Sequence, residues 1–453
     1  MTDSTLSPVA RRRLPDKAEL AELVAEMIEE ADRQGAVAAE ASASTSFGLS
    51  VKVRHAEVDT LEHMRDRGLA VTVYFDQRKG TASSADFSRA SLAETVRAAC
   101  DIARYTSEDP CAGLADAERM AAGVPDLKLY YPWDVAPEEA IDLARQCESA
   151  ALGVDPRLTN SEGAEITAHQ GVHVYGNSHG FLEGYPSSQH SISCAVVGRV
   201  GEAMQRDYWY TTARDPSALQ AAEAVGQEAG RRTVQRLGAR RLSTRSVPVL
   251  FTPMVARSLF GHFLGAIQGS SLYRRASFLL DSLDTRVFPD WLTIKEQPHL
   301  QGALGSAPFD GEGVATQSRT LIEDGILRGY VLSSYSARKL GMQTTGNAGG
   351  IHNLEVEPGA MDYPQLLQDM HQGLVVSHLM GQGVNPVTGD YSRGAAGFWV
   401  ENGEVAFPVE EITIAGRLRE MFERIRAVGR DVDIRGNIRT GSVLVDGMTI
   451  AGE

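Results

Sequence analysis

Three short motifs in the chain contain residue types that could carry out catalysis. Residues 176–180 fit the pattern G-x-S-x-G, residues 336–339 fit S-x-x-K, and His169 and His173 stand four residues apart. The corresponding chemistry would be a serine nucleophile on a strand-to-helix turn, a serine activated by lysine, and a pair of metal ligands. Each of these requires a particular local structure, which the flanking sequence must supply.

The flanking sequence favours a structural role for all three motifs. A strand precedes residues 176–180, but another turn follows them instead of a helix, so we predict a hairpin. Residues 336–339 lack the companion K-T-G and S-D-N elements, which predicts a surface helical turn. The alternating pattern around His169 and His173 predicts a strand, in which four residues span about 13 Å. One zinc ion holds its nitrogen ligands at about 2 Å, so it cannot bind both histidines.

Other candidate sites fail on a missing residue. Residues 431–436 begin like a calcium loop. However, the fifth position, which should supply an oxygen ligand, is Arg435, and the twelfth, which should be glutamate, is Ser442. Residues 346–350 are glycine-rich, yet they lack the Lys-Ser/Thr pair of a phosphate loop. The aromatic residues 208–210 are interpreted as core or interface packing. None of the eleven histidines is followed by glutamate, which excludes the metallopeptidase motifs that begin with His-Glu.

The composition narrows the class of protein. The 453 residues carry a formal net charge of −15, which disfavours binding to nucleic acid or to an anionic membrane surface. No apolar segment approaches the length of about 18 residues that a membrane span needs, and no signal peptide is recognised. The four cysteines have no CxxC spacing, and none lies beyond Cys194. We therefore predict a cytoplasmic protein with reduced thiols.

The pattern of elements predicts an α+β protein whose second half is richer in β-structure. Glycine is unevenly distributed, with 15 of the 44 before residue 227 and 29 after it. We expect an N-terminal α/β part with helices on a mixed sheet, followed by a β-rich, glycine-rich C-terminal domain. The predicted divisions are a disordered tail (1–15), an N-terminal α+β domain (16–130), a central β-meander with helices (131–243) and the C-terminal domain (244–453). Predicted helices include 16–34, 88–105, 137–152, 217–237, 255–268 and 417–427, and hairpin turns are expected at 323–325 and 401–403.

Several longer strings are typical of one known family. Residues 261–267 (GHFLGAI), 335–341 (YSARKLG), 349–353 (GGIHN) and 388–403 (TGDYSRGAAGFWVENG) resemble the PmbA (TldE) branch of the TldD/PmbA family. The resemblance implies a peptidase system of two related chains that processes small or unfolded peptides. In that system the TldD-type chain carries H-E-x-x-x-H and a cysteine in its second half, and these residues hold a zinc ion.

The metal motif of the family falls on residues 257–262 of this chain. Arg257 stands where the first histidine ligand would be, Ser258 stands where the glutamate base would be, and only Gly261 and His262 match. A guanidinium has no free lone pair and stays charged, so it repels a cation. The resemblance therefore implies no catalytic residue and no zinc in this chain, with zinc expected in a TldD-type partner.

The implied role is that of a partner subunit, with two alternatives left open. We expect a heterodimer or higher assembly with a TldD-type chain, and peptide substrates; whether the chain alone forms a homodimer is left open. Candidate residues of a peptide groove are His262, Tyr273, Arg274 and His352. One alternative is a stand-alone metallopeptidase with a differently built site, such as His262 with His352 or His378. The other is a regulatory protein of the type named modulator of DNA gyrase.

Overall fold

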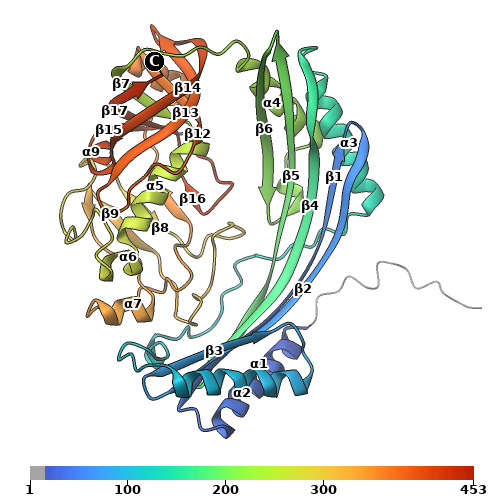
Figure 1. Cartoon of the computed structure of the whole chain (residues 1–453), viewed down its shortest axis with the longest axis vertical. Coiled ribbons are helices and arrows are strands. Elements are labelled where there is room, and N and C mark those ends of the chain that lie inside the picture. The colour runs from blue at the N-terminus through green and yellow to red at the C-terminus, as the bar shows by residue number, and fades with distance from the viewer. Residues whose placement is uncertain (1–15, 453) are drawn as a thin grey trace, which may run out of the picture.

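A computed structural model of the chain describes residues 16–452, and Figure 1 shows a long curved sheet facing a second, more compact region. The predicted tail at residues 1–15 lies outside the described residues. The described strands form two six-stranded sheets and one five-stranded sheet. Among the described helices, none is both long and apolar enough to cross a membrane.

The N-terminal sheet is antiparallel throughout and follows the order β3-β2-β1-β4-β5-β6. The prediction of a mixed sheet is therefore wrong. Tight hairpin connections, such as the turn between β4 and β5, reverse the chain, whereas a parallel neighbour needs a long crossover. The strands are β1 (Ala38–Arg54), β2 (Glu57–Phe75), β3 (Arg78–Ser84), β4 (Leu158–Asn177), β5 (Leu182–Val200) and β6 (Ala203–Ala213).

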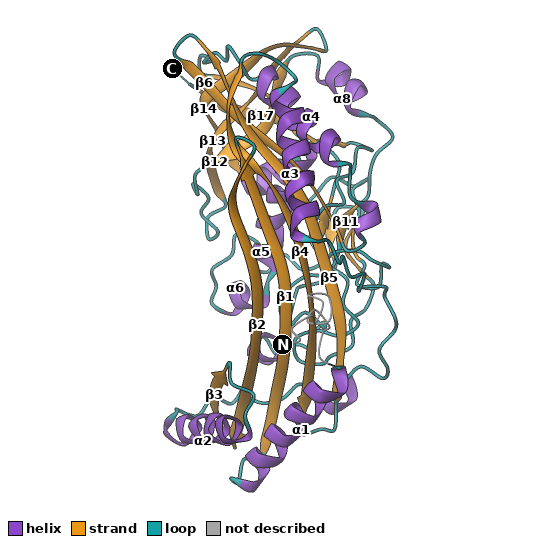
Figure 2. Cartoon of the chain, turned by 90° about the vertical axis from the view of Figure 1, so that its right-hand side faces the viewer, coloured by secondary structure: helices purple, strands orange, loops and turns teal. Residues whose placement is uncertain are grey.

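Four helices cover parts of this sheet. Figure 2 shows α1 (Lys17–Arg33) and α2 (Arg89–Tyr105) at one end, with α3 (Pro137–Leu152) and α4 (Ala222–Gln235) at the other. Each pair buries its own apolar cluster against the strands. The packing of α3 on α4 requires glycine, because a Cβ at Gly226 would lie 1.9 Å from the carbonyl oxygen of Cys147. Short 3-10 turns lie at Ala117–Arg119 and Pro216–Ala218.

The C-terminal half is built around a sheet that closes on itself. Its order is β14-β13-β12-β7-β17-β15, and an additional pairing of β14 with β17 completes a barrel. This half contains the largest apolar cluster of the described residues. The strands are β7 (Arg245–Phe251), β12 (Gly373–Met380), β13 (Asp390–Glu401), β14 (Glu404–Arg417), β15 (Ile425–Val428) and β17 (Val443–Ala451).

A smaller sheet and short helices complete the C-terminal half. The sheet contains β8 (Ile294–Glu296), β9 (Arg319–Glu323), β10 (Ile326–Leu327), β11 (Leu354–Val356) and β16 (Ile438–Arg439). The helices are α5 (Pro253–Ile267), α6 (Gly269–Tyr273), α7 (Ser334–Lys339), α8 (Tyr363–Met370) and α9 (Leu418–Glu423).

Two predicted helices are longer than the observed ones. The helix predicted at 217–237 spans only Ala222–Gln235, because Pro216–Ala218 form a separate 3-10 turn before it. Both hairpin turns are confirmed, and at 402–403 the positive φ angles of Asn402 (53°) and Gly403 (76°) explain the Asn-Gly sequence. The helix predicted at 417–427 ends at Glu423, because the apolar residues that follow pair with β17 as β15.

Candidate functional site: the degenerate motif and the cleft beside it

Helix α5 positions the degenerate motif. The helix begins at Pro253, directly after β7, and proline suits the first turn because its missing N–H would have no partner there. The apolar side chains of α5 pack into the barrel core, including Ala256, Leu259, Phe260 and Phe263. Arg257 lies outside this apolar face and reaches the N-terminal sheet through Tyr210.

Arg257 joins α5 to two other segments. Its Nη2 donates to the hydroxyl of Tyr210 on β6 at 2.9 Å, and Nη1 donates to the carbonyl oxygen of Arg435 at 3.3 Å. The same guanidinium lies 3.7 Å from the carboxylate of Asp433. Asp433 in turn receives two bonds from the Arg435 guanidinium, at 2.9 and 3.0 Å. We call these four residues, Arg257, Tyr210, Asp433 and Arg435, the motif junction.

The charges of the motif junction stabilise one another. Burial acts against the charged guanidinium of Arg257, but the bond to Tyr210 and the nearby Asp433 outweigh it, so the pKa of Arg257 is raised. Burial also acts against the Asp433 carboxylate, but the bonds and charge of Arg435 outweigh it, so the pKa of Asp433 is lowered. Guanidiniums remain protonated in proteins, so the two guanidiniums of the motif junction against its one carboxylate leave a positive surplus. That surplus repels a metal cation.

The other two motif positions also lack the chemistry of a zinc site. Ser258 donates its hydroxyl to the carbonyl oxygen of Val255 within α5, at 2.7 Å. His262 packs its ring edge-on against Tyr391, with ring centroids 6.0 Å apart. Burial, and to a lesser extent the charge of Arg393, lowers the pKa of His262, and its Nε2 has no hydrogen-bond partner among the described residues. The residues at the family's metal position therefore do not fit zinc.

The histidines of the alternative metal site contact different partners. His378 lies 3.0 Å from the carboxylate of Asp207 on β6 and 2.9 Å from the hydroxyl of Ser377. His352 contacts the carbonyl oxygen of Gly346 at 3.2 Å. Within residues 16–452, no three or more His, Cys, Asp or Glu residues are grouped so that they could hold a metal ion.

A cleft of about 770 Å³ lies beside the motif junction, between the two halves of the molecule. Its walls come from β6, the start of α5 and two loops, and they include Trp209, Thr211, Thr212, Pro253, Met254, residues 301–304 and residues 431–435. The four predicted groove residues are not among the residues that line this cleft. Tyr273 packs edge-on against Tyr335 at 5.9 Å, and the guanidinium of Arg274 lies over the Tyr273 ring.

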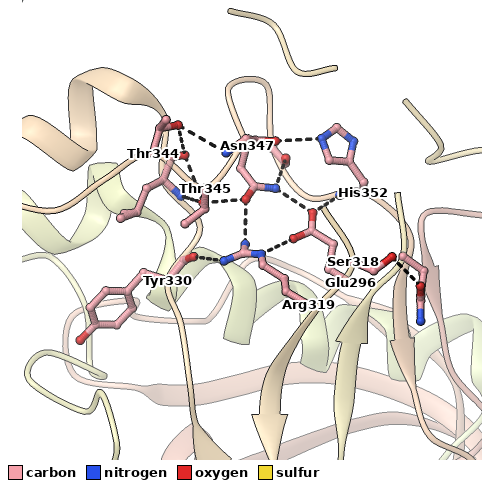
Figure 3. A network of polar contacts seen from close by, with 12 residues as sticks. Glu296, Ser318, Arg319, Tyr330, Thr344, Thr345, Asn347 and His352 are labelled. Atoms are coloured by element: carbon pink, nitrogen blue, oxygen red, sulfur yellow. Dashed lines mark hydrogen bonds and ion pairs between the residues drawn. The ribbon is translucent and has the colours of Figure 1, made fainter. Parts of the chain in front are cut away.

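His352 belongs to a separate buried network that holds the loop 344–353 (Figure 3). The carboxylate of Glu296 accepts from Arg319 Nε at 2.6 Å, from Asn347 Nδ2 at 2.7 Å and from the backbone N–H of His352 at 2.9 Å. Arg319 also donates to the Asn347 amide oxygen at 2.7 Å. The side chain of Asp310 accepts from the N–H of Ala348 in the same loop, at 2.8 Å. We call these residues, Glu296, Asp310, Arg319, Asn347 and His352, the loop anchor.

Of the three short motifs, two have the structural roles that we predicted, and the helical turn at 336–339 is not wholly on the surface. Residues 176–180 form the turn between β4 and β5, and His169 and His173 lie on β4, so the hairpin and strand predictions are confirmed. Residues 336–339 are helical, but Ser336 is buried and caps α7 together with Ser333. The interpretation of residues 208–210 as interface packing is also confirmed, because the Arg435 guanidinium lies 4.1 Å from the Trp209 ring and 4.5 Å from the Tyr210 ring.

The cleft and the motif junction are features that the sequence analysis missed. They combine β6 with residues more than 200 positions later, and no local pattern reports such a contact. The sequence signal that could have pointed to the cleft is the uncharged run of aromatic residues and threonines at 208–212. The rejected calcium-like segment turns out to supply Asp433 and Arg435 to the motif junction.

Comparisons with known proteins match one family along nearly the whole chain. Models of the first, central and C-terminal domains of PmbA/TldA metallopeptidases match residues 39–103, 130–237 and 244–452. The chain is 54% identical to Metalloprotease PmbA of Escherichia coli O157:H7, with 92% of each chain covered. It is 50% identical to the Metalloprotease PmbA homolog of Haemophilus influenzae, with 96% of each covered.

Solved structures of similar proteins share the fold. A protein of Bacteroides thetaiotaomicron described as a candidate modulator of DNA gyrase is 29% identical, with a TM-score of 0.92 over 97% of this chain and all of that one. TldE of Thermococcus kodakarensis is 20% identical, with a TM-score of 0.80 over 95% of this chain and all of that one, which shows a common fold.

Proposed function

This chain belongs to the PmbA/TldD family of metallopeptidases, and from that premise we propose that it is the PmbA/TldE-type subunit of a two-chain peptidase. In this proposal a TldD-type paralogue carries the zinc and the hydrolytic chemistry. The present chain contributes to binding small or unfolded peptides and takes no part in metal chemistry.

The proposal rests on the side chains at the motif position, which are already bonded to other parts of the fold. Arg257 stands where the family's active chain has a metal-binding histidine, and its guanidinium is engaged with Tyr210, Asp433 and the Arg435 carbonyl. Ser258 cannot act as a carboxylate base, and its hydroxyl is bonded within the helix. The motif therefore lacks the residues that would bind the metal and activate water, while a cleft lies beside it.

A reconstitution experiment tests this proposal. The chain and a TldD-type chain of the same organism are co-expressed, and a tag on one is used to purify both. Cleavage of an unfolded peptide is then measured for the TldD-type chain alone, for this chain alone and for the pair. We expect co-purification, no cleavage by this chain alone, and faster cleavage by the pair than by the TldD-type chain alone.

Two outcomes would overturn the proposal. Cleavage by this chain alone, in a preparation free of the TldD-type chain, would favour a stand-alone metallopeptidase. An equal cleavage rate with and without this chain would remove its role as a partner subunit. A Ser258→Ala variant is a matched control, because we expect it to support the pair as well as the unaltered chain does.

A further inference from the structure

The N-terminal sheet has two free edges, and their side chains differ. On one side β3 pairs only with residues 69–75 of β2, so residues 57–68 form an open edge. That edge carries charges along its length, at Glu57, Asp59, Glu62, Arg65, Asp66 and Arg67, as edges do when they resist pairing with another chain. On the other side β6 ends the sheet, and its residues 208–213 carry no charge.

Some outward-facing backbone groups of β6 are bonded to arginines, and those of Thr212 are not. Arg435 Nη1 and Arg236 Nη1, both from outside the sheet, donate to the carbonyl oxygens of Tyr210 and Arg206 at 2.6 Å. Backbone groups of alternate residues in an antiparallel edge strand point to the same side, so those of Thr212 also point away from β5. Neither the N–H nor the C=O of Thr212 has a hydrogen-bond partner among the described residues.

The cleft runs along this edge. Its walls include Trp209, Thr211 and Thr212, and consecutive strand residues project to opposite faces of a sheet. A cleft lined by neighbouring residues of both faces lies along the edge between them. Figure 1 shows β6 as the strand of the N-terminal sheet that faces the C-terminal half, which supplies the opposite wall through residues 301–304 and 431–435.

The walls favour a ligand that is recognised through its backbone. The charged side chains of the cleft near β6 are engaged within the fold. Arg435 pairs with Asp433, Arg232 pairs with Asp207, and Arg214 donates to the carbonyl oxygens of residues 303 and 304. The apolar contribution comes from Trp209, Met254 and Ile434, the last of which is 59% exposed. Such a surface offers hydrogen bonds and general apolar contact, with little preference for the charge of a ligand.

We propose that an extended peptide binds in this cleft as an additional strand on the edge of β6, with Thr212 donating and accepting the pairing hydrogen bonds. Strand addition reads the peptide main chain and tolerates many side chains, which suits unfolded peptide segments. The proposal rests on the proposed function, because it names the place where this subunit holds the peptide.

Arg435 competes with the peptide in this arrangement. Its guanidinium occupies the Tyr210 carbonyl, the next outward acceptor along β6 from Thr212. A peptide that extends past Thr212 gains this acceptor only if the guanidinium leaves it. Loss of the Arg435 side chain should therefore strengthen peptide binding, whereas loss of the Thr212 N–H should weaken it.

The test measures peptide binding to the full chain by fluorescence anisotropy. The probe is a fluorescein-labelled octapeptide of alternating valine and threonine with lysine at each end. Thr212→Pro removes an N–H that does not pair with β5, and proline is tolerated on an edge strand whose N–H faces outward. Thr212→Ala is the matched control, because it removes the side chain and keeps the N–H. We expect a Kd about tenfold weaker for Thr212→Pro and within about twofold of the original for Thr212→Ala.

A second variant keeps the proposal falsifiable if Thr212→Pro fails to fold. Arg435→Ala should bind the octapeptide about threefold more tightly. Absence of octapeptide binding by the unaltered chain, unchanged binding by folded Thr212→Pro, or weaker binding by folded Arg435→Ala would each overturn the proposal.

The peptide site and the partner role can fail separately. If Thr212→Pro supports cleavage by the TldD-type chain as well as the unaltered chain does, the edge of β6 is not the peptide site, although the partner role stands. If the unaltered chain does not change that cleavage while octapeptide binding depends on Thr212, the partner role fails and the peptide site stands.

Discussion

The motif junction and the loop anchor both pair arginine with a carboxylate, but they connect different parts of the molecule. The loop anchor lies within the C-terminal half, where Glu296 is 1% exposed and receives three hydrogen bonds. The motif junction connects the two halves beside an open cleft. Its Arg257 and Asp433 side chains are 21% and 5% exposed, close to the 19% and 2% of Arg319 and Glu296, so the difference lies in what is connected. The same ion-pair chemistry fixes a loop in one place and joins the two halves in the other.

This difference bears on Arg257, which stands where the family resemblance places a metal ligand. An arginine at a metal position could remain idle or destabilise the fold by bringing an uncompensated charge into a partly buried site. Here it is compensated by Asp433 and Tyr210. In this chain the Arg257 side chain connects the two halves beside the cleft.

The largest expected effect is at the loop anchor. Glu296→Ala leaves the Arg319 guanidinium and the Asn347 amide buried without their carboxylate, and removal of one member of a buried ion pair costs about 3–5 kcal/mol. We expect a loss of that size in the free energy of unfolding, measured by urea denaturation. Glu296→Gln keeps the shape and one acceptor, and should lose less. A loss for Glu296→Ala no greater than that for Arg257→Ala would contradict the claim that the loop anchor contributes more stability than the motif junction.

The loop anchor should also respond to pH through Asp310. Burial, partly offset by hydrogen bonds from backbone N–H groups, raises the pKa of Asp310 to about 7. Between the ordinary carboxyl pKa and 7 the folded chain holds a proton that the unfolded chain lacks. The contribution of Asp310 to stability is therefore greatest at low pH and is lost as pH rises toward 7, by at most about 1.4 kcal/mol per pH unit.

The measurement is the free energy of unfolding between pH 5 and pH 7, compared with that of Asp310→Asn. The difference between the two proteins isolates Asp310 from other titrating groups. The original chain should gain stability relative to the variant as pH falls. Two curves that stay parallel over this range would show that Asp310 is already ionised at pH 5.

The motif junction should be less costly to disrupt. Arg257→Ala removes the bonds to the Tyr210 hydroxyl and the Arg435 carbonyl and one ion pair, but Asp433 keeps both bonds to the Arg435 guanidinium. We expect a loss of about 1–2 kcal/mol in the free energy of unfolding. Because the contact joins the two halves, hydrogen exchange should quicken at amides of β6 more than at those of the loop 344–353. Equal acceleration at both places would contradict a bridging role.

The smallest effect is expected at Ser258. Its hydroxyl bonds only the Val255 carbonyl within α5, and alanine is a better helix former. Ser258→Ala should change the free energy of unfolding by less than about 1 kcal/mol. It should also leave peptide cleavage by the reconstituted pair unchanged. A large loss of cleavage with intact stability would assign this position a catalytic role that its chemistry does not suggest.

The sequence predicts local features of the molecule well and long-range ones poorly. The helix predicted at 16–34 and the Asn-Gly turn at 402–403 are encoded within a few neighbouring residues, and both are confirmed. The direction of the strands in the N-terminal sheet depends on how distant segments meet, and the expectation of a mixed sheet was wrong. The family resemblance predicts from residue type alone that Arg257 replaces a histidine ligand and that Ser258 replaces the glutamate base. The contacts of Arg257 with Tyr210 and Asp433, which lie 47 and 176 residues away in the chain, required the fold.

The central claim is that the chain does not itself form the family's catalytic zinc site, and the most direct test is its metal content. The chain is purified alone without chelator, dialysed against zinc, and analysed by elemental mass spectrometry beside a His262→Ala variant and a TldD-type chain. We predict stoichiometric zinc in the TldD-type chain, and no difference between the unaltered chain and the variant. Stoichiometric zinc in the unaltered chain that is lost in His262→Ala would contradict the account.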